Sequence, residues 1–313
     1  MPLSEFDLID RYFRNCSHKR PDVRLGIGDD AALLDSPAGC DLVAAIDTIV
    51  DGVHFPPGCP AASVGHRVLA VNLSDLAAMG AKPAWALLAL TLPNIDEHWL
   101  SEFAAGFGDL AQSHDVQLVG GDTTSGPLCA TVQILGHVPR GQGLVRSGAR
   151  PGDIVFVSGT PGDAAAGLAV EQGRLKADPD ATAYLRKRFL FPTPRMALGK
   201  SLRGFASACI DISDGLLGDV GKLAQASSCG VELEYEHLPV SESLVEAVGD
   251  PRARELALTG GDDYELCFTV SPGNVARLRR GALLWRSAPV RGARRSGRRR
   301  ARARARAYRR GRL

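Results

Sequence analysis

The feature that most constrains this chain is a set of aspartates placed where apolar stretches end, most of them beside glycine, serine or threonine. They stand in the segments GIGDDA, IDTIVDGVHF, VNLSDLAAMG, GGDTTSG, IDISDG and GGDDYEL. Mg²⁺ takes oxygen ligands and binds through a few carboxylates plus substrate phosphates, so this composition is typical of cation and phosphate sites. Two bare carboxylates about 4 Å apart repel by roughly 4 kcal/mol near a protein surface. A fold that brings several of them together would therefore need cations at that place.

Length and composition fit one large or two ordinary domains, because 313 residues with 45% hydrophobic side chains can build a substantial core. The N-terminus lacks the basic start and apolar run of a signal peptide. The longest apolar stretch, residues 84–93, is too short to cross a bilayer. The seven cysteines are scattered and form no CxxC pair, which favours buried thiols in a reducing compartment over disulfides or zinc. We therefore expect a cytoplasmic protein that does not enter the membrane.

The charge of the chain divides into two parts. Residues 276–313 contain 16 arginines and no acidic residue. Taking these 16 from the 37 lysines and arginines leaves 21 basic against 35 acidic residues in residues 1–275, a formal net charge of −14. The acidic body suits cation binding, whereas the basic tail suits contact with polyanions.

Hydrophobic patterning predicts strands alternating with helices in both halves, which is typical of α/β or α+β layers. Strands are predicted at 23–28, 42–46, 84–92, 116–119, 128–138, 154–158, 208–212 and 265–270, and helices at 5–15, 62–80, 96–114 and 214–227. A segment rich in Gly, Arg and Pro predicts a domain boundary near residue 148, which gives domains at 1–148 and 149–275. Residues 276–313 have no apolar period and low complexity, so we expect no fold there.

Two glycine-rich segments imitate nucleotide-binding motifs. GIGDDA matches GxGxxA after a predicted strand, but the following ALLDSPAG does not open a long helix. It serves better as a tight turn that exposes Asp29 and Asp30. ALGKSL ends like a Walker A loop, but Pro194 stands where the first glycine is required and the segment is predicted to be helical. We therefore expect neither a Rossmann site nor a P-loop.

Some of the polar residues have structural interpretations that the sequence leaves open. Asp75 falls on the apolar stripe of the predicted helix 62–80, where an unpaired carboxylate is costly, so it either pairs at a helix end or serves a site. Asp122 is either a turn residue or holds a cation on an anion that the neighbouring glycine N–H groups approach. His54 has no second His or Cys at metal-site spacing, which favours a structural role.

The DISDG segment also has two interpretations. Ser213 or Asp214 is predicted at a helix N-cap, where both residue types are favoured. Alternatively, Asp211 and Asp214 bind Mg²⁺ while Ser213 and the helix N-terminus receive phosphate oxygens.

Taken together, these motifs resemble the thiamine-monophosphate kinase family. The matching segments are GIGDDAALL, DTIVDGVHF, AVNLSDLAAMGAKP, GGDTTSGPL, VSGTPGDAAAGL, IDISDGLLGD and GGDDYELCF. They occur in order and at matching spacing from about residue 3 to residue 275. The wider superfamily includes aminoimidazole ribonucleotide synthetase and selenophosphate synthetase, and uses acidic metal sites without a Walker A loop. The resemblance implies a two-domain α/β (α+β) fold of the aminoimidazole ribonucleotide synthetase type, with N-terminal domains that pair through a barrel-like interface in a homodimer.

The resemblance also implies the activity and its site. The γ-phosphoryl group of ATP would pass to thiamine monophosphate, with nucleotide bound in a cleft between the two domains near the dimer interface. The residues that match the family's Mg²⁺ ligands are Asp30, Asp47, Asp75, Asp122, Asp211 and Asp214. Those that match its nucleotide contacts are Gly121, Arg146 and Ser213, and those near the thiamine phosphate are His54 and Asp262.

The chemistry of this reaction agrees with the residues present. The acceptor is a phosphate oxygen that is already ionised near pH 7, so no general base is needed. Phosphoryl transfer depends mainly on positioning and charge stabilisation. We therefore expect direct in-line transfer without a phosphorylated enzyme, and no catalytic residue beyond those that position metals and phosphates. The alternatives are a related enzyme with another acceptor, or a weakened enzyme whose basic tail binds nucleic acid in a salt-sensitive way. We expect no contact with nucleic acid other than nonspecific contact by the arginine-rich tail.

The chain departs from the family pattern in three places. Ala45 and Ile46 stand where the family has hydroxyl residues, which removes any side-chain oxygen ligand there. Asp262 replaces a glutamate and is one methylene shorter. Residues 276–313 replace the family's last elements, including an aromatic residue that packs on the thiamine, and neither Trp285 nor Tyr308 is placed there by its pattern. The abrupt shift to Arg, Ala and Gly suggests a frame change in the coding sequence.

Overall fold

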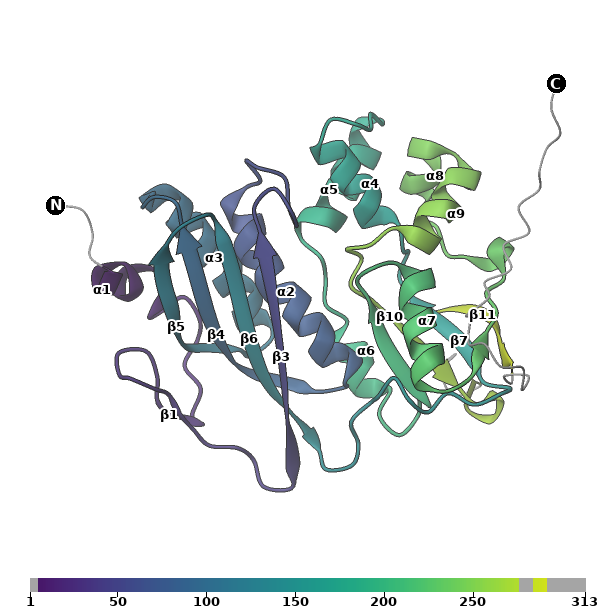
Figure 1. The fold of residues 1–313 in the computed structure, drawn as a ribbon, viewed down its shortest axis with the longest axis horizontal. Helices are drawn as coiled ribbons and strands as arrows, with labels where there is room; N and C mark the ends of the chain where they lie inside the picture. Colours follow the sequence, from purple (N-terminus) through teal and green to yellow (C-terminus); the bar gives the residue numbers. More distant parts are fainter. Residues whose placement is uncertain (1–4, 276–283, 292–313) are drawn as a thin grey trace.

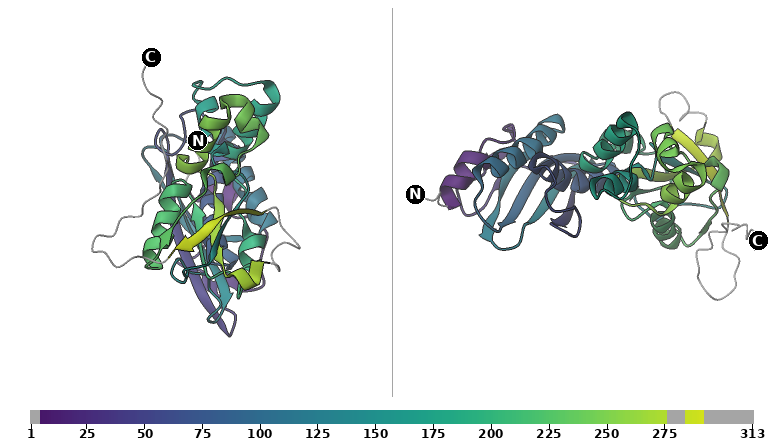
Figure 2. Two further views of the ribbon diagram at one scale, coloured as in Figure 1. Left: turned by 90° about the vertical axis from the view of Figure 1, so that its right-hand side faces the viewer. Right: turned by 90° about the horizontal axis from the view of Figure 1, so that it is seen from above.

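The computed structural model describes residues 5–275 and 284–291 as two halves, each a sheet covered by helices (Figure 1). Seen from above, the two halves lie end to end (Figure 2). The elements of the first half are α1 Glu5–Leu8, the π-helical turn η1 Ile9–Phe13, β1 Val23–Leu25, β2 Leu33–Leu34, β3 Cys40–Val50, α2 Ala61–Ala78, β4 Lys82–Leu92, α3 Glu97–Ser113, β5 Gln117–Ser125 and β6 Cys129–Pro139. Its main sheet has the order β3-β6-β4-β5, in which only β4 and β5 are parallel.

The second half is built on an antiparallel sheet. Its elements are β7 Ile154–Ser158, α4 Asp163–Glu171, α5 Pro179–Leu190, α6 Met196–Ser201, β8 Ala208–Ile212, α7 Leu216–Ala226, β9 Gly230–Val231, η2 Tyr235–His237, α8 Glu242–Val248, α9 Asp250–Thr259, β10 Glu265–Val270, η3 Pro272–Asn274 and β11 Leu284–Arg291. The strand order is β8-β10-β7-β11-β9, and every pair of neighbours is antiparallel. Two layered halves of this kind confirm the predicted two-domain α/β (α+β) architecture, whereas the boundary at residue 148 stays a prediction.

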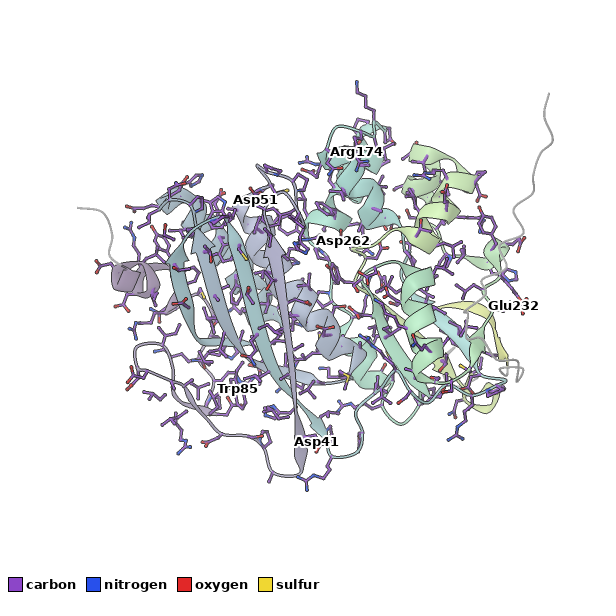
Figure 3. The ribbon with its side chains drawn as sticks, in the orientation of Figure 1. Asp41, Asp51, Trp85, Arg174, Glu232 and Asp262 are labelled. Carbon is purple, nitrogen blue, oxygen red and sulfur yellow. The ribbon has the colours of Figure 1, made fainter. Side chains whose placement is uncertain are left out.

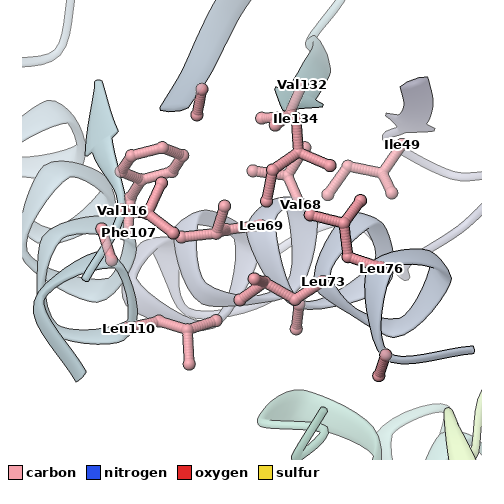
Figure 4. Close-up of a cluster of buried hydrophobic side chains, with 14 of the residues drawn as sticks. Ile49, Val68, Leu69, Leu73, Leu76, Phe107, Leu110, Val116, Val132 and Ile134 are labelled. Atoms are coloured by element: carbon pink, nitrogen blue, oxygen red, sulfur yellow. The ribbon is translucent and has the colours of Figure 1, made fainter. Parts of the chain in front are cut away.

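Helix α2 is the element that joins the two halves. It contacts β3 and β6 of the first sheet, α3 beside it, and α6, β8 and β10 of the second half. Nearly all of its side chains are buried, and Figure 4 shows Val68, Leu69, Leu73 and Leu76 packed among residues of the first sheet and α3. A helix that is apolar around most of its circumference is buried on several sides. Two of its polar residues reach the second half: Arg67 contacts Asp262, and Ser74 contacts Asp211.

The α2–α3 contact is unusually close because it is made through glycines. A Cβ added to Gly106 of α3 would lie 2.0 Å from the carbonyl oxygen of Ala62. A Cβ on Gly65 of α2 would lie 2.0 Å from the carbonyl oxygen of Phe103. Helix α3 is capped at its N-terminus by Asp96, whose carboxylate accepts hydrogen bonds from the backbone N–H groups of His98 and Trp99.

One face of the first sheet is largely open. Side chains of a strand alternate between its faces, so Val43, Ala45 and Ile49 of β3 face the core while Leu42 and Ile46 face outward. Leu42 is 56% exposed and Ile46 is 64% exposed. The β1–β2 ribbon covers another part of this face, and there Val23 and Leu34 pack near Trp85. Figure 1 shows α2 and α3 on the opposite face.

Several predicted elements need correction. Strands β3 and β5 run further than predicted, to Val50 and Ser125, so Asp47 and Asp122 lie within strands rather than in loops after them. Residues 5–15 form one α-helical turn and a π-helical turn ending at Phe13. The prediction that nothing folds beyond residue 275 is wrong for residues 284–291, because β11 pairs with β7 and β9. The rest of the tail, Tyr308 included, lies outside the described residues.

No helix within the residues that the structure describes is long and apolar enough to cross a membrane. All seven cysteines fall within the described ranges and are free thiols. The predicted helix over ALGKSL is confirmed as α6, which agrees with the rejection of a P-loop there.

Candidate active site where the two halves meet

Three of the predicted carboxylates come together from three different elements. Asp47 lies on β3, Asp75 near the end of α2, and Asp211 near the end of β8 in the second half. The carboxyl groups of Asp47 and Asp75 share a hydrogen bond, and the charge of Asp211 acts on Asp75. Ser74 Oγ donates a hydrogen bond of 2.9 Å to Asp211 Oδ2. The cluster therefore depends on α2, which brings a strand of each half to one place.

The electrostatics of this cluster disfavour three bare carboxylates. Desolvation, with the charges of Asp211 and Asp47, raises the pKa of Asp75 to about 7. Asp47 keeps contact with solvent, but partial desolvation by the surrounding protein still raises its pKa. Asp211 is buried, and desolvation raises its pKa as well. Arg146 lies close enough to lower the pKa of both Asp75 and Asp211. A cation bound among these carboxylates would offset the repulsion that raises the pKa of Asp75.

The donor set fits a hard divalent cation. The converging ligand atoms are carboxylate oxygens, which Mg²⁺ prefers to the thiol and imidazole ligands typical of zinc sites. Within the described residues, no three side chains of His, Cys, Asp and Glu already stand at metal-ligand spacing. Because Asp47 and Asp75 are hydrogen-bonded to each other, cation binding requires that bond to break.

The DISDG turn is organised by a residue that the sequence reasoning did not select. The N-cap of α7 is Gly215, so the predicted cap at Ser213 or Asp214 is wrong. Instead, Asp219 Oδ2 accepts hydrogen bonds of 3.0 Å from the backbone N–H groups of both Ser213 and Asp214. Lys222 Nζ donates to Asp219 at 2.7 Å and to Asp214 at 2.5 Å. Asp219 is part of IDISDGLLGD, but only the folded turn shows that its carboxylate bends back onto the chain.

Of the two residues predicted near the substrate, His54 lies beside Asp47 and Asp262 is tied to α2. His54 Nδ1 accepts a 3.1 Å hydrogen bond from the Val50 N–H, and the ring is near enough to lower the pKa of Asp47. Asp262 is held by Arg67 Nη2, which donates to Oδ1 at 2.5 Å. Figure 3 places Asp262 between the halves. No sequence signal selected Arg67, because its partner is 195 residues away.

The structure does not bring every predicted ligand into this cluster. In the register of the sheet, Asp47 on β3 lies opposite Val132 on β6. Val132 lies opposite Leu88 on β4, and Leu88 lies opposite Gly121 on β5. Gly121 is therefore three strand spacings away from Asp47. With about 4.8 Å between strands, this separation is roughly 14 Å. Asp122 follows on the same edge strand and is exposed. Within one chain, Asp47 and Asp122 therefore cannot ligate the same ion in this arrangement.

The GGDTTSG and GIGDDA segments have local structural explanations as well. Gly121 has φ of 149°, and a Cβ there would lie 1.8 Å from the Leu88 carbonyl oxygen, so the β4–β5 pairing itself requires glycine. Asp30 is exposed in the loop between β1 and β2, and its N–H donates to Asp29 Oδ1 at 2.8 Å. The roles predicted for Asp30, Gly121 and Asp122 stay predictions.

Comparison with known proteins places this geometry in a family. Residues 28–138 match the AIR synthase related protein N-terminal domain, and residues 150–280 match the corresponding C-terminal domain. The chain is 52% identical over 284 residues to the thiamine-monophosphate kinase of Escherichia coli strain K12, covering 90% of this chain and 86% of that protein. The chain belongs to the thiamine-monophosphate kinase family. The predicted resemblance is confirmed.

Two solved structures of this family share the fold. The thiamine-monophosphate kinase of Stenotrophomonas maltophilia K279a superimposes with a TM-score of 0.86 at 47% identity, covering 94% of this chain and 96% of that one. The structure of AaThiL complexed with AMPPCP and TMP has a TM-score of 0.76 at 32% identity, covering 94% and 93%. An ATP analogue and TMP therefore occupy a protein of this fold together.

Proposed function

We propose that this chain transfers the γ-phosphoryl group of ATP to thiamine monophosphate, giving thiamine diphosphate and ADP. The observation that supports this best is the meeting of Asp47, Asp75 and Asp211 where α2 joins the halves. A site that must hold two phosphate-bearing anions needs bound cations, and this cluster needs a cation to relieve its own repulsion. Membership of the family supplies the identity of the acceptor.

The reaction requires one bond to form and one to break. A phosphate oxygen of thiamine monophosphate attacks the γ-phosphorus of ATP in line, and the bond from that phosphorus to the β,γ-bridging oxygen breaks to release ADP. Because the attacking oxygen is already ionised near pH 7, the chain needs no general base. Asp262 and His54 position the acceptor, and Arg146 offsets negative charge between the substrates. These roles consist of positioning and charge stabilisation, which dominate phosphoryl transfer.

One Mg²⁺ ion would be held by Asp47, Asp75 and Asp211. Asp30, Asp122 and Asp214 are the proposed ligands of further Mg²⁺ ions. When bound, these ions would neutralise charge on the transferring phosphates. Ser74 keeps Asp211 oriented through its hydrogen bond. Asp219 and Lys222 hold the backbone of the DISDG turn in place. Gly121, Arg146 and Ser213 are the proposed nucleotide contacts.

Ala45, Ile46 and Asp262 differ from the family pattern, but oxygen ligands remain at all three positions. The backbone carbonyls at residues 45 and 46 remain, and Asp262 keeps its carboxylate. The proposed reaction does not depend on the arginine-rich tail, residues 276–313, for which the sequence suggests a frame change. Most of that tail lies outside the described residues. Intact-mass measurement of the natural protein decides whether that tail is made.

The proposal is tested by incubating the protein with ATP, Mg²⁺ and thiamine monophosphate and separating the products by chromatography. We expect thiamine diphosphate and ADP in equal amounts, with no phosphate label retained on the protein from labelled ATP. ADP formed without thiamine diphosphate would indicate another acceptor. Absence of both products would contradict the proposal.

We also propose that the chain works as a homodimer in which the open face of the first sheet meets the same face of a second copy. Leu42 and Ile46 are exposed on this face beside Ala44, which gives an apolar surface along β3, the edge strand of the sheet. Thr48 and Thr131 hydrogen-bond to each other on it, so their polar groups are partly satisfied. Contiguous apolar surface of this kind marks an interaction site. Pairing of two such sheets would give the barrel-like interface that the family resemblance implies.

Ile46→Lys is expected to convert the dimer into a monomer, because a charge would then be buried at the centre of the interface. Light scattering after size-exclusion chromatography should give twice the chain mass of 33.1 kDa for the wild type and a single chain mass for the variant. Ile95→Lys is the matched control, since Ile95 is 47% exposed and lies in the loop between β4 and α3 rather than on a strand of this sheet. A wild-type monomer, or a variant that still dimerises, would contradict the proposed interface.

A further inference from the structure

Arg67 is a buried cation on α2 that contacts the second half at two points. Its side chain is 3% exposed, and Nη1 donates a 2.6 Å hydrogen bond to the Phe189 carbonyl oxygen at the end of α5. Nη2 donates to Asp262 Oδ1 at 2.5 Å. The guanidinium lies over the Phe189 ring, 4.4 Å from its centroid, and 5.8 Å from the Tyr264 ring centroid. Arg67 therefore fixes the loop that carries Asp262 relative to α2.

That loop has a backbone conformation that ordinary side chains rarely adopt. Asp262 has φ of 69° and Tyr264 has φ of 51°, both in the left-handed region. The backbone is held there by hydrogen bonds from the Asp262 N–H to the Ser213 carbonyl and from the Tyr264 N–H to the Ile212 carbonyl, both 2.9 Å. Such conformations persist only where surrounding contacts impose them, and they cluster at ligand sites.

The two oxygens of the Asp262 carboxylate differ in their hydrogen bonds. Oδ1 accepts hydrogen bonds from Arg67 and from the Tyr264 hydroxyl, the latter at 3.2 Å. For Oδ2, no hydrogen-bonding protein group occurs in the described part of the chain, and the side chain is 30% exposed. One oxygen is thus anchored to protein while the other remains available to a ligand.

We propose that Arg67 is a positioning residue for the acceptor substrate: by holding Oδ1 of Asp262, it directs Oδ2 toward thiamine monophosphate. This rests on the proposed function, in which Asp262 meets that substrate. Aspartate is one methylene shorter than glutamate, so its reach depends strongly on how its loop is held. The forked, rigid guanidinium of arginine can hold Phe189 and Asp262 at once, which a lysine ammonium on a flexible stem cannot do with the same geometry.

A purely structural role explains Arg67 less well. Its Nε is buried and has no hydrogen-bond partner among the described residues, which is unfavourable for a group kept only for stability. Replacing a buried ion pair with well-packed apolar residues is often neutral or stabilising. The pair formed by Arg67 and Asp262 therefore fits a residue retained for the geometry of its partner.

The test is steady-state kinetics with each substrate varied separately, for wild type, Arg67→Met, Arg67→Lys, Asp262→Asn and the double variant Arg67→Met/Asp262→Asn. We expect Arg67→Met to raise KM for thiamine monophosphate about tenfold or more and KM for ATP less than about twofold. Arg67→Lys should fall between wild type and Arg67→Met. The double variant should be no worse than Asp262→Asn, because Arg67 acts through Asp262.

Arg20→Met is the matched control, since Arg20 is also a buried arginine, 8% exposed, paired with Asp22 and Asp115 far from Asp262. It should lower thermal stability while leaving both KM values unchanged. Equal rises in both KM values for Arg67→Met, or additive losses in the double variant, would overturn the positioning role. If Arg67→Met does not fold, Arg67→Lys and Asp262→Asn carry the same comparison.

Calorimetric titration with thiamine monophosphate in the presence of AMPPCP separates failure of this inference from failure of the proposed function. A wild-type protein that binds thiamine monophosphate, with Arg67→Met binding it equally well, would overturn the role of Arg67 alone. A wild-type protein that neither binds nor phosphorylates thiamine monophosphate would overturn both. Weakened binding by Arg67→Met, with AMPPCP affinity retained, supports the inference.

Discussion

Asp75→Asn is expected to lower kcat/KM by roughly 10²–10³-fold, because it removes a central carboxylate from the site that stabilises charge during transfer. Steady-state rates of thiamine diphosphate formation measure this loss. Asp41→Asn is the matched control: Asp41 lies on the same half of the molecule, near the far end of β3, where it accepts a hydrogen bond from the Gly141 N–H (Figure 3). Its replacement should leave the rate within about twofold of wild type.

The same Asp75→Asn variant is expected to be more stable than wild type when no metal is present. An acid whose pKa is higher in the folded state binds more protons when folded, so stability falls as pH rises from the unfolded to the folded pKa. For Asp75 that window runs from 3.8 to about 7. At pH 8 the neutral amide avoids this cost, and a gain of roughly 1–2 kcal/mol would raise Tm by several degrees.

Thermal unfolding of both proteins in chelator, at pH 8 and at pH 4, tests the sign of this effect. The difference in Tm should be present at pH 8 and should shrink toward pH 4, because there Asp75 is protonated in the folded state and is close to its ordinary pKa of 3.8 in the unfolded chain. A variant that loses activity but is less stable at pH 8 would show that Asp75 is a structural residue whose interactions stabilise the fold.

Gly106→Ala is expected to destabilise the protein by about 3 kcal/mol or more, because overpacking at this contact cannot be relieved by a side-chain rotation. The added methyl group would lie 2.0 Å from the Ala62 carbonyl oxygen, and the obstructing atoms belong to the backbone of α2. Helices α2 and α3 would have to separate, which also disturbs the helix that carries Asp75. Denaturant unfolding measures the change.

Gly218→Ala in α7 is the matched control for that substitution. No atom lies within 4 Å of a Cβ at Gly218, which is an exposed position inside a helix. Alanine there should raise stability by about 0.5–1 kcal/mol, because it restricts the unfolded chain and favours the helix. Equal changes in the free energy of unfolding for Gly106→Ala and Gly218→Ala would show that α2 and α3 can move apart without loss of stability.

The fold could be predicted best where a strand is buried on both faces. Residues 154–158, 208–212 and 265–270 are short apolar runs between polar turns, and the structure has strands with those bounds. The ends of β3 and β5 were underestimated because they alternate apolar with Asp, Thr and Gly, a pattern that also describes a loop. For β11, arginine-rich composition obscured a strand whose partners β7 and β9 are distant in sequence.

The site could be predicted in part for a related reason. Each acidic motif is visible in the sequence, but which motifs meet depends on tertiary contacts. The meeting of Asp47, Asp75 and Asp211 requires α2 to lie between β3 and β8. Asp219 and Arg67 went unselected because each acts through a partner that only the folded chain brings near. The resemblance to a family supplied the substrates, which spacing alone does not specify.

The acidic cluster as a cation site is tested most directly by crystals grown with Mn²⁺, AMPPCP and thiamine monophosphate. An anomalous difference map should show a Mn²⁺ peak with oxygens of Asp47, Asp75 and Asp211 at roughly 2.2 Å, and the hydrogen bond between Asp47 and Asp75 should be broken. A map in which Asp47 and Asp75 remain hydrogen-bonded, with Mn²⁺ bound elsewhere on the nucleotide, would contradict this account.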